Sequence, residues 1–275
     1  MNTRELKGHA AMRDRRRAIV EPTMTSFVDM LLMLDPKILR HLKFPPWFPL
    51  VYDRKDQGAL SETERERFLC AYDVLIANGT LGQLVMIHGE THYHHGTQRF
   101  LPWHRVYLIM LEHALQSVHP DVTIPYWDWT QAAEETFPAW LAGVTPPVPM
   151  PPPQAPITVT RSPGNTSWLA SMASNIPSIM TITDLPSFTS NLEGVHGGVH
   201  VWVGGTMSSI PTAPADPIFW MHHANIDRLW WQWQQSHAGK NPNLTGTGPS
   251  SPVMDPWSYT EPQTRDINAL GYAYV

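Results

Sequence analysis

The chain has 275 residues, 42% of them hydrophobic and only 16% charged, so it can bury a substantial core. A formal net charge of −5 gives no electrostatic basis for binding nucleic acid, and a single cysteine excludes a fold held by disulfides. No apolar run is long enough for a membrane span, and no secretory signal is visible. We therefore expect no membrane partner, and a protein that is cytoplasmic or exported by a helper.

The first predicted elements are helical. Residues 3–42 mix charged and apolar positions in a roughly helical rhythm, which the prolines within 44–49 must interrupt. A second helix is predicted to begin after Ser61, because a serine followed three residues later by Glu64 is a capping-box pattern. The sequence NGT at 78–80 is predicted to end it.

Two further helices are predicted to carry histidines. Residues 81–89 are typical of a short helix that contains His88. A longer and largely buried helix, which contains His104, is predicted from Pro102, with the proline in its first turn. The aromatic residues 124–129 are predicted to form a packed, extended segment.

The second half of the chain is predicted to combine irregular segments with one strong helix. The proline-rich residues 145–153 indicate a surface loop that is neither helix nor central strand. Residues 154–190 are rich in Ser, Thr, Pro and Asn, and we expect short helical turns there at most. An amphipathic helix is predicted over 217–235, followed by a loop-like tail. The predicted fold class is mainly α, a four-helix bundle with long irregular Pro-rich loops and little β.

Nine of the 14 histidines fall in two groups, one within residues 88–104 and one within 196–223. His196 and His200 are four residues apart, which places both on one face of a helix, and His223 begins another helix. These three can form a trigonal metal site with an open position. In the first group, the four-residue spacing favours His88 and His92 as a pair of ligands and does not exclude His94.

Two sites made only of histidine limit which metal ion can bind. Neither group has a carboxylate or thiolate at comparable spacing, which disfavours Mg²⁺ and Ca²⁺ and favours copper or zinc. Catalytic zinc sites usually carry a carboxylate base, so a zinc hydrolase is the weaker hypothesis. Ligands that project inward from facing helices are a known way to build a dinuclear centre, and we expect one here.

Two long motifs contain histidines of these groups: FLPWHRVYLIMLE at 100–112 and DPIFWMHHANIDRLW at 216–230, with GVHGGVHVWVGGTM between them. They resemble the copper signatures of the tyrosinase family, the type-3 copper proteins that include tyrosinases, catechol oxidases and haemocyanins. The final Tyr272-Ala-Tyr274 is similar to the Tyr-x-Tyr that closes the family's core. The resemblance covers about residues 60–275 and implies a helical bundle that holds two copper ions. It also implies O2 as co-substrate and a small phenol as substrate.

The resemblance assigns six copper ligands: His88, His95 and His104 for the first ion, and His196, His200 and His223 for the second. The interval from His88 to His95 is shorter than in many bacterial tyrosinases, so His92 and His94 stay as alternatives. The resemblance also places Val201, Ile210 and His222 around the substrate. Asp227 is expected to hydrogen-bond a ligand imidazole, with an ion pair to a neighbouring arginine as the alternative.

The reaction implied is oxidation of o-diphenols to o-quinones. Hydroxylation of monophenols is harder, because a phenol with a pKa of about 10 must first lose its proton. Many tyrosinases use a Glu together with an Asn that follows the first ligand of the second copper. Glu193 matches the Glu, with a stabilising carboxylate near a helix N-terminus as the alternative. Gly197 stands where the Asn would be, which favours o-diphenol or o-aminophenol oxidation.

Several further expectations follow from the resemblance. We expect one domain over 1–275, with a catalytic core at 51–275 and an extension at 1–50 that packs on or covers it. The chain ends just past Tyr274, so we expect no C-terminal lid domain. Tyr93 stands where some relatives carry a cysteine, so no thioether to His95 is expected, and Cys70 lies well upstream. A copper-delivery chaperone is a candidate partner, and an oxygen-carrying haemocyanin is the weaker alternative.

Overall fold

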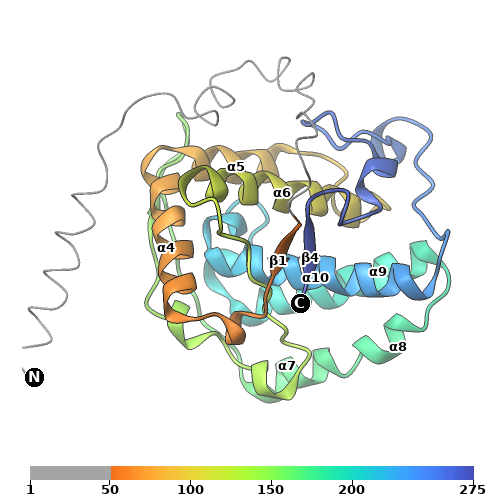
Figure 1. Cartoon of the computed structure of the whole chain (residues 1–275), viewed down its shortest axis with the longest axis horizontal. Helices are drawn as coiled ribbons and strands as arrows, with labels where there is room; N and C mark the ends of the chain where they lie inside the picture. Colours follow the sequence, from red (N-terminus) through yellow and green to blue (C-terminus); the bar gives the residue numbers. More distant parts are fainter. Residues whose placement is uncertain (1–50) are drawn as a thin grey trace, which may run out of the picture. The chain divides into compact units, whose positions relative to one another are not determined.

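The computed structural model describes residues 51–275, which are mainly helical, as the sequence predicts (Figure 1). The helix rhythm of 3–42 and the proline break at 44–49 lie outside the described residues, and the division into a core and an N-terminal extension stays a prediction. One long helix, α6 (Phe100–Val118), contacts α4, α5, α9 and α10. The helix bundle predicted from the sequence is therefore confirmed.

The helices α4 and α5 begin and end where the sequence predicts. In α4 (Glu62–Ala77) the Ser61 hydroxyl accepts a hydrogen bond from the Glu64 backbone N–H, and the Glu64 carboxylate accepts one from Ser61 N–H at 2.8 Å. Gly79 adopts a left-handed φ of 83°, which ends this helix and starts α5 (Thr80–Glu90) after a sharp turn. That turn brings α5 across α6.

The most deeply buried helices are α6 and α10 (Pro217–Ser236), which pack on each other. The helix α10 has the predicted bounds to within one residue. Asp216 caps it by accepting a hydrogen bond from Ile218 N–H at 3.0 Å, and Pro217 occupies the first turn. The Asp216 carboxylate also pairs with the buried Arg161 at 2.7 Å, which anchors the cap to an outer loop.

The prediction of irregular structure over 154–190 is wrong. This segment contains α7 (Thr166–Ala173), α8 (Ile176–Met180) and the first turn of α9 (Leu185–Val203). Asn165 caps α7 by accepting from Trp168 N–H at 2.9 Å, and Asp184 caps α9 by accepting from Ser187 N–H at 3.0 Å. The polar and proline residues that suggested loops are therefore caps and first-turn residues of short helices.

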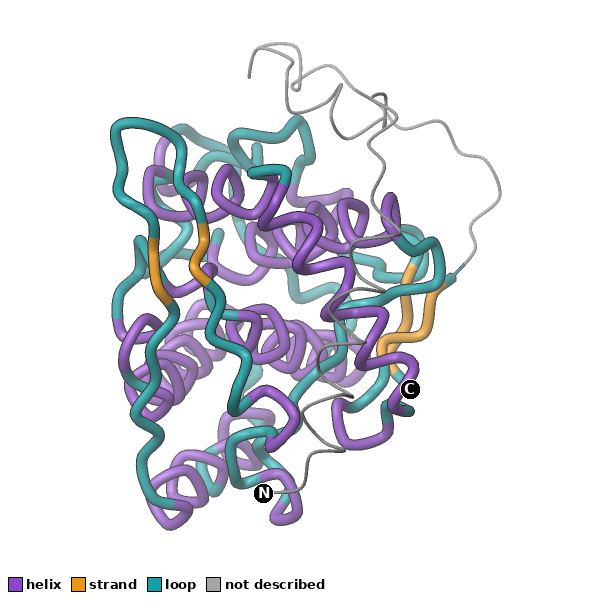
Figure 2. The backbone as a smooth tube through the Cα atoms, turned by 90° about the vertical axis from the view of Figure 1, so that its left-hand side faces the viewer, coloured by secondary structure: helices purple, strands orange, loops and turns teal. Residues whose placement is uncertain are grey.

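The β structure consists of two small pairs, drawn in orange in Figure 2. The strands β1 (Tyr52–Arg54) and β4 (Tyr272–Tyr274) are parallel and join the two ends of the described chain. The strands β2 (Pro147–Val148) and β3 (Ile157–Thr158) are antiparallel. The Pro-rich segment 145–153 is thus a loop except for β2, which tolerates proline because a two-stranded pair has no central strand.

Short 3₁₀ turns complete the described chain: η1 (Gln57–Ala59), η2 (Ala132–Glu134), η3 (Ala139–Leu141), η4 (Gly205–Ser208), η5 (Ala213–Ala215), η6 (Gly248–Ser250) and η7 (Glu261–Thr264). No single helix within 51–275 is long and apolar enough to cross a membrane. Within these residues one pair, α4 and α5, meets the length and composition of a span when taken together, and the two helices are bent by 78° at their junction.

Candidate metal centre

Three imidazoles of the second histidine group converge on one point. His196 and His200 lie one turn apart on α9, and His223 faces them from α10. The Nε2 atom of His223 lies 3.0 Å from Nε2 of His196 and 3.1 Å from Nε2 of His200. The structure thus brings together the three residues that the resemblance assigns to the second copper.

Backbone carbonyls determine which ring nitrogens are free. The Nδ1–H of His200 donates to the Met207 carbonyl at 2.9 Å, and that of His196 donates to the Glu193 carbonyl at 3.3 Å. Both Nε2 atoms therefore carry lone pairs directed at His223. A single N–H of His223 could satisfy only one of them, whereas a cation between the three rings satisfies all.

His222 is not a suitable ligand, although its nitrogen lies within 4.8 Å of those of His196 and His200. The indole N–H of Trp129 donates to Nδ1 of His222 at 3.0 Å, so the proton of His222 sits on Nε2 and faces the His196 carbonyl at 3.3 Å. The only lone pair, on Nδ1, accepts from Trp129, and Nε2 carries the proton, so neither ring nitrogen is available to a metal. The ring is also 0% exposed, and its expected place beside the substrate stays a prediction.

The first group is built from two helices and one loop. His88 of α5 donates through Nδ1–H to the Ile210 carbonyl at 2.8 Å, and His104 of α6 donates to the Phe100 carbonyl at 2.8 Å. Their Nε2 atoms lie 3.4 Å apart. The same carbonyl-oriented arrangement therefore recurs in both groups, as is typical of metal-binding histidines.

The loop between α5 and α6 supplies two histidines. Ligand atoms of His94 and His95 lie within 4.8 Å of each other and of those of His88 and His104. His92 is exposed on the surface and takes no part in this cluster. Spacing alone favoured His92, which lies outside the cluster. The structure instead supports His95, as the resemblance implied, and leaves His94 as a further candidate ligand.

The two groups form one centre. The rings of His104 and His223 stack with centroids 4.5 Å apart. Phe219 contacts a histidine of each group, since its centroid lies 4.0 Å from that of His223 and 5.1 Å from that of His88. Phe100 lies on another side, 4.8 Å from His104 and 4.9 Å from His196. Sequence reasoning did not single out these two phenylalanines, although both stand within the copper signatures.

Burial keeps these imidazoles neutral. Desolvation, and secondarily the neighbouring rings, hold the pKa of His88, His104, His196 and His223 well below the usual value. The pKa of His200 is lowered to about 4 by the same burial. Neutral imidazole is the form that binds metal. The two potential metal-binding groups within the described residues consist of histidine alone, which fits copper.

Glu193 and Gly197 flank the first ligand of the second group. The Glu193 carboxylate accepts a hydrogen bond from the Gly96 N–H at 2.7 Å, which links α9 to the loop of His94 and His95. Burial raises the pKa of Glu193. A Cβ added at Gly197 would meet no atom within 4 Å, so a side chain would fit there.

The other two residues expected at the substrate are exposed apolar side chains. Val201, four residues after Gly197 on α9, is 55% exposed, and Ile210 is 52% exposed. The carbonyl of Ile210 holds the His88 ring, so its backbone is fixed to the metal centre. Both side chains are therefore free to contact a ligand that approaches from solvent.

The expected contact between Asp227 and a ligand imidazole is not present. The Asp227 carboxylate pairs with Arg105 at 2.5 Å and accepts hydrogen bonds from the hydroxyls of Tyr272 and Tyr274, each at 2.6 Å. Arg54 lies 3.6 Å from the same carboxylate. The alternative reading, an ion pair with a neighbouring arginine, is confirmed, and the residue joins α10 to α6 and to β4.

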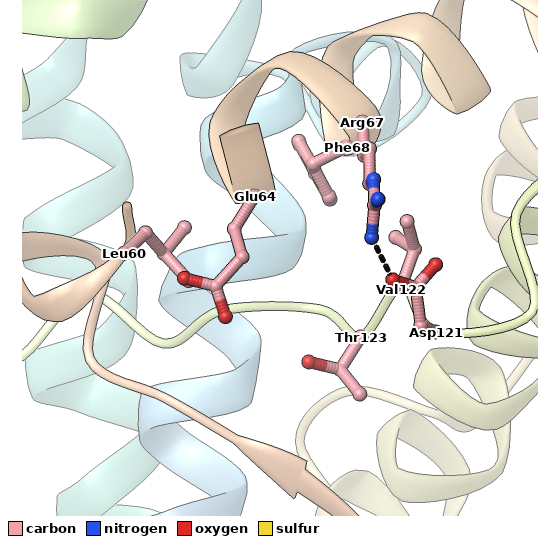
Figure 3. Close-up of a pocket in the computed structure, with 7 residues that line it drawn as sticks. All are labelled: Leu60, Glu64, Arg67, Phe68, Asp121, Val122 and Thr123. Atoms are coloured by element: carbon pink, nitrogen blue, oxygen red, sulfur yellow. Dashed lines mark hydrogen bonds and ion pairs between the residues drawn. The ribbon is translucent and has the colours of Figure 1, made fainter. Parts of the chain in front are cut away.

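A separate surface pocket lies between the start of α4 and residues 121–123 (Figure 3). Its charged side chains pair with protein groups, since Arg67 contacts Asp121 and Glu64 binds Lys55 at 2.6 Å. It contains no histidine, and we assign it no role in the metal chemistry.

Comparison with known proteins agrees with this centre. The profile of the common central domain of tyrosinase matches residues 78–166 and 143–236. The tyrosinase of Streptomyces glaucescens is 33% identical over 259 residues, covering 76% of this chain and 93% of that protein. The tyrosinase of Streptomyces antibioticus is 32% identical, covering 76% and 94%. A solved functional unit of octopus haemocyanin is 26% identical, with a TM-score of 0.66, covering 82% of this chain and 68% of that one. The chain therefore belongs to the tyrosinase family and is a type-3 copper phenol oxidase.

Proposed function

We propose that the protein uses O2 to oxidise o-diphenols to o-quinones, with weak hydroxylation of monophenols. Two o-diphenols would give two o-quinones while one O2 is reduced to two waters. The observation that carries this proposal is the convergence of neutral imidazoles from α5, α6, α9 and α10, combined with glycine at position 197.

The residues around the centre have separable roles. Bound copper would supply the electron transfer between the phenol and O2. The carbonyls of Ile210, Phe100 and Met207 hold three of the histidines with Nε2 directed inward. The rings of Phe100 and Phe219 occupy space next to the histidines and exclude water.

Proton removal limits the monophenol reaction. Burial raises the pKa of Glu193, which makes its carboxylate a better base, but one of its oxygens is already bound to Gly96 N–H. Position 197 offers no side chain to orient a water beside it. An o-diphenol needs no hydroxylation, so we propose it as the preferred substrate, with Val201 and Ile210 in contact with its ring.

A substrate panel on copper-loaded protein tests this function. We expect a catechol to be oxidised faster than its matching monophenol. If the matching o-aminophenol is turned over faster than the catechol, the preferred substrate class is o-aminophenols and not o-diphenols. Reversible O2 binding without turnover of any of the three would contradict the proposal and favour an oxygen carrier. Copper delivery by a chaperone and the cellular location stay proposals from the sequence.

Gly197→Asn is expected to raise the ratio of monophenol to catechol turnover by up to about a hundredfold, the lower end of what a positioned proton acceptor contributes. The free space at Gly197 allows the substitution. Gly194→Asn is the matched control, since this glycine lies one turn earlier on α9 with equally open space. A wild-type enzyme that hydroxylates as fast as it oxidises would show that Gly197 is not limiting.

A further inference from the structure

His94 is a buried imidazole without a partner. It is 4% exposed, and neither of its ring nitrogens makes a hydrogen bond. The backbone of Thr91 faces it without reaching hydrogen-bond geometry. A buried polar ring left unsatisfied in this way lowers stability, so a role as an ordinary core histidine does not account for it.

The position of His94 points to the metal. Its ring centroid lies 4.2 Å from that of His95, 4.8 Å from His88 and 5.6 Å from His104. All four residues offer ligand atoms within 4.8 Å of one another. On its other side the ring lies against Trp103, with centroids 4.4 Å apart, and so has no access to water.

The loop backbone is bent so that consecutive histidines reach the same place. In extended chain, neighbouring side chains point to opposite sides. Tyr93 instead has a left-handed φ of 66°, which is rare for a non-glycine residue, and Gly96 has a φ of 67°. The Glu193 carboxylate fixes the Gly96 N–H at 2.7 Å. A strained backbone held from outside is a common feature of ligand-binding loops.

We propose that the first copper of this protein has four imidazole donors, with His94 acting beside His88, His95 and His104. The proposal rests on the dicopper function and adds a nitrogen ligand that this function does not require. It follows that either loop histidine, together with His88 and His104, can retain the ion when the other is removed. The second copper has no such reserve, because both nitrogens of His222 bind protein groups.

Copper binding by full-length variants tests the proposal without measuring catalysis. The variants are His94→Leu, His95→Leu, the double variant, and His92→Leu as the matched control on the exposed part of the same loop. We expect each single variant to keep two copper ions per chain, with the first Cu(I) dissociation constant raised on the order of tenfold to a hundredfold in chelator competition. The double variant should keep one ion, and the control should match wild type.

Thermal unfolding of the metal-free and copper-loaded forms gives a second readout. Leucine removes the unsatisfied nitrogens, so metal-free His94→Leu should melt at or above the wild-type temperature, while copper should raise its melting temperature less than it does in wild type. A purely structural role would lower both. The proposal is overturned if His94→Leu binds copper like wild type while His95→Leu loses one ion, or if the reverse holds. A wild type that binds fewer than two ions would overturn the dicopper function itself.

Discussion

Replacing His223 by alanine is expected to leave one copper ion per chain and to lower o-diphenol oxidation by on the order of a thousandfold. The three nitrogens of the second group meet at His223 Nε2, so its removal leaves a pair that cannot enclose an ion. A metal contributes several kcal/mol to such a reaction, and each 1.36 kcal/mol is a factor of ten in rate. Metal analysis and oxygen consumption measure the two effects.

The adjacent His222 provides the control for this prediction. His222→Leu should keep two copper ions, because both ring nitrogens of His222 are occupied by protein groups. It should still lower the free energy of unfolding by about 1–3 kcal/mol, since the Trp129 N–H and the His196 carbonyl lose a partner in a buried site. Loss of copper from His222→Leu with retention in His223→Ala would reverse the assignment of the ligand.

The residues that sequence reasoning placed correctly are those on regular helices. The four-residue interval between His196 and His200, and the helix that begins before His223, fix their directions through helical periodicity. The choice between His222 and His223 needed the resemblance, because both stand in the same turn. The structure explains that choice through Trp129, which lies 93 residues away in sequence.

The residues that could not be placed from the sequence are positioned by backbone outside regular helices and strands. The left-handed backbone conformation of Tyr93 brings His94 into the cluster, and no periodic sequence pattern predicts such a conformation. The carbonyls of Ile210 and Met207 orient ligands through backbone atoms, which every residue type carries. The helices α7 and α8 were missed because their short length leaves capping residues dominant in the composition.

Asp227 was expected to contact either a ligand imidazole or an arginine; it pairs with Arg105, and its contacts predict a large effect on stability. Asp227→Asn should lower the free energy of unfolding by about 3–5 kcal/mol, because it leaves the buried Arg105 without its ion-pair partner. It also weakens the hydrogen bonds from Tyr272 and Tyr274 that hold β4 against the helices. Denaturant unfolding of the metal-free protein measures the loss.

A double-mutant cycle with Tyr274→Phe separates this role from one at the metal. The Tyr274 hydroxyl donates its hydrogen bond to Asp227 Oδ2. Removing this hydroxyl should therefore lower the free energy of unfolding less in the Asp227→Asn background than in wild type, with a coupling energy of about 0.5–3 kcal/mol. Folded Asp227→Asn should bind two copper ions with wild-type affinity. Additive losses of stability, or a weakened second copper in folded protein, would instead connect Asp227 to a ligand imidazole. The contacts that hold β4 and part of the metal centre both lie on α10. Folding and copper binding must therefore be measured separately to distinguish the two roles.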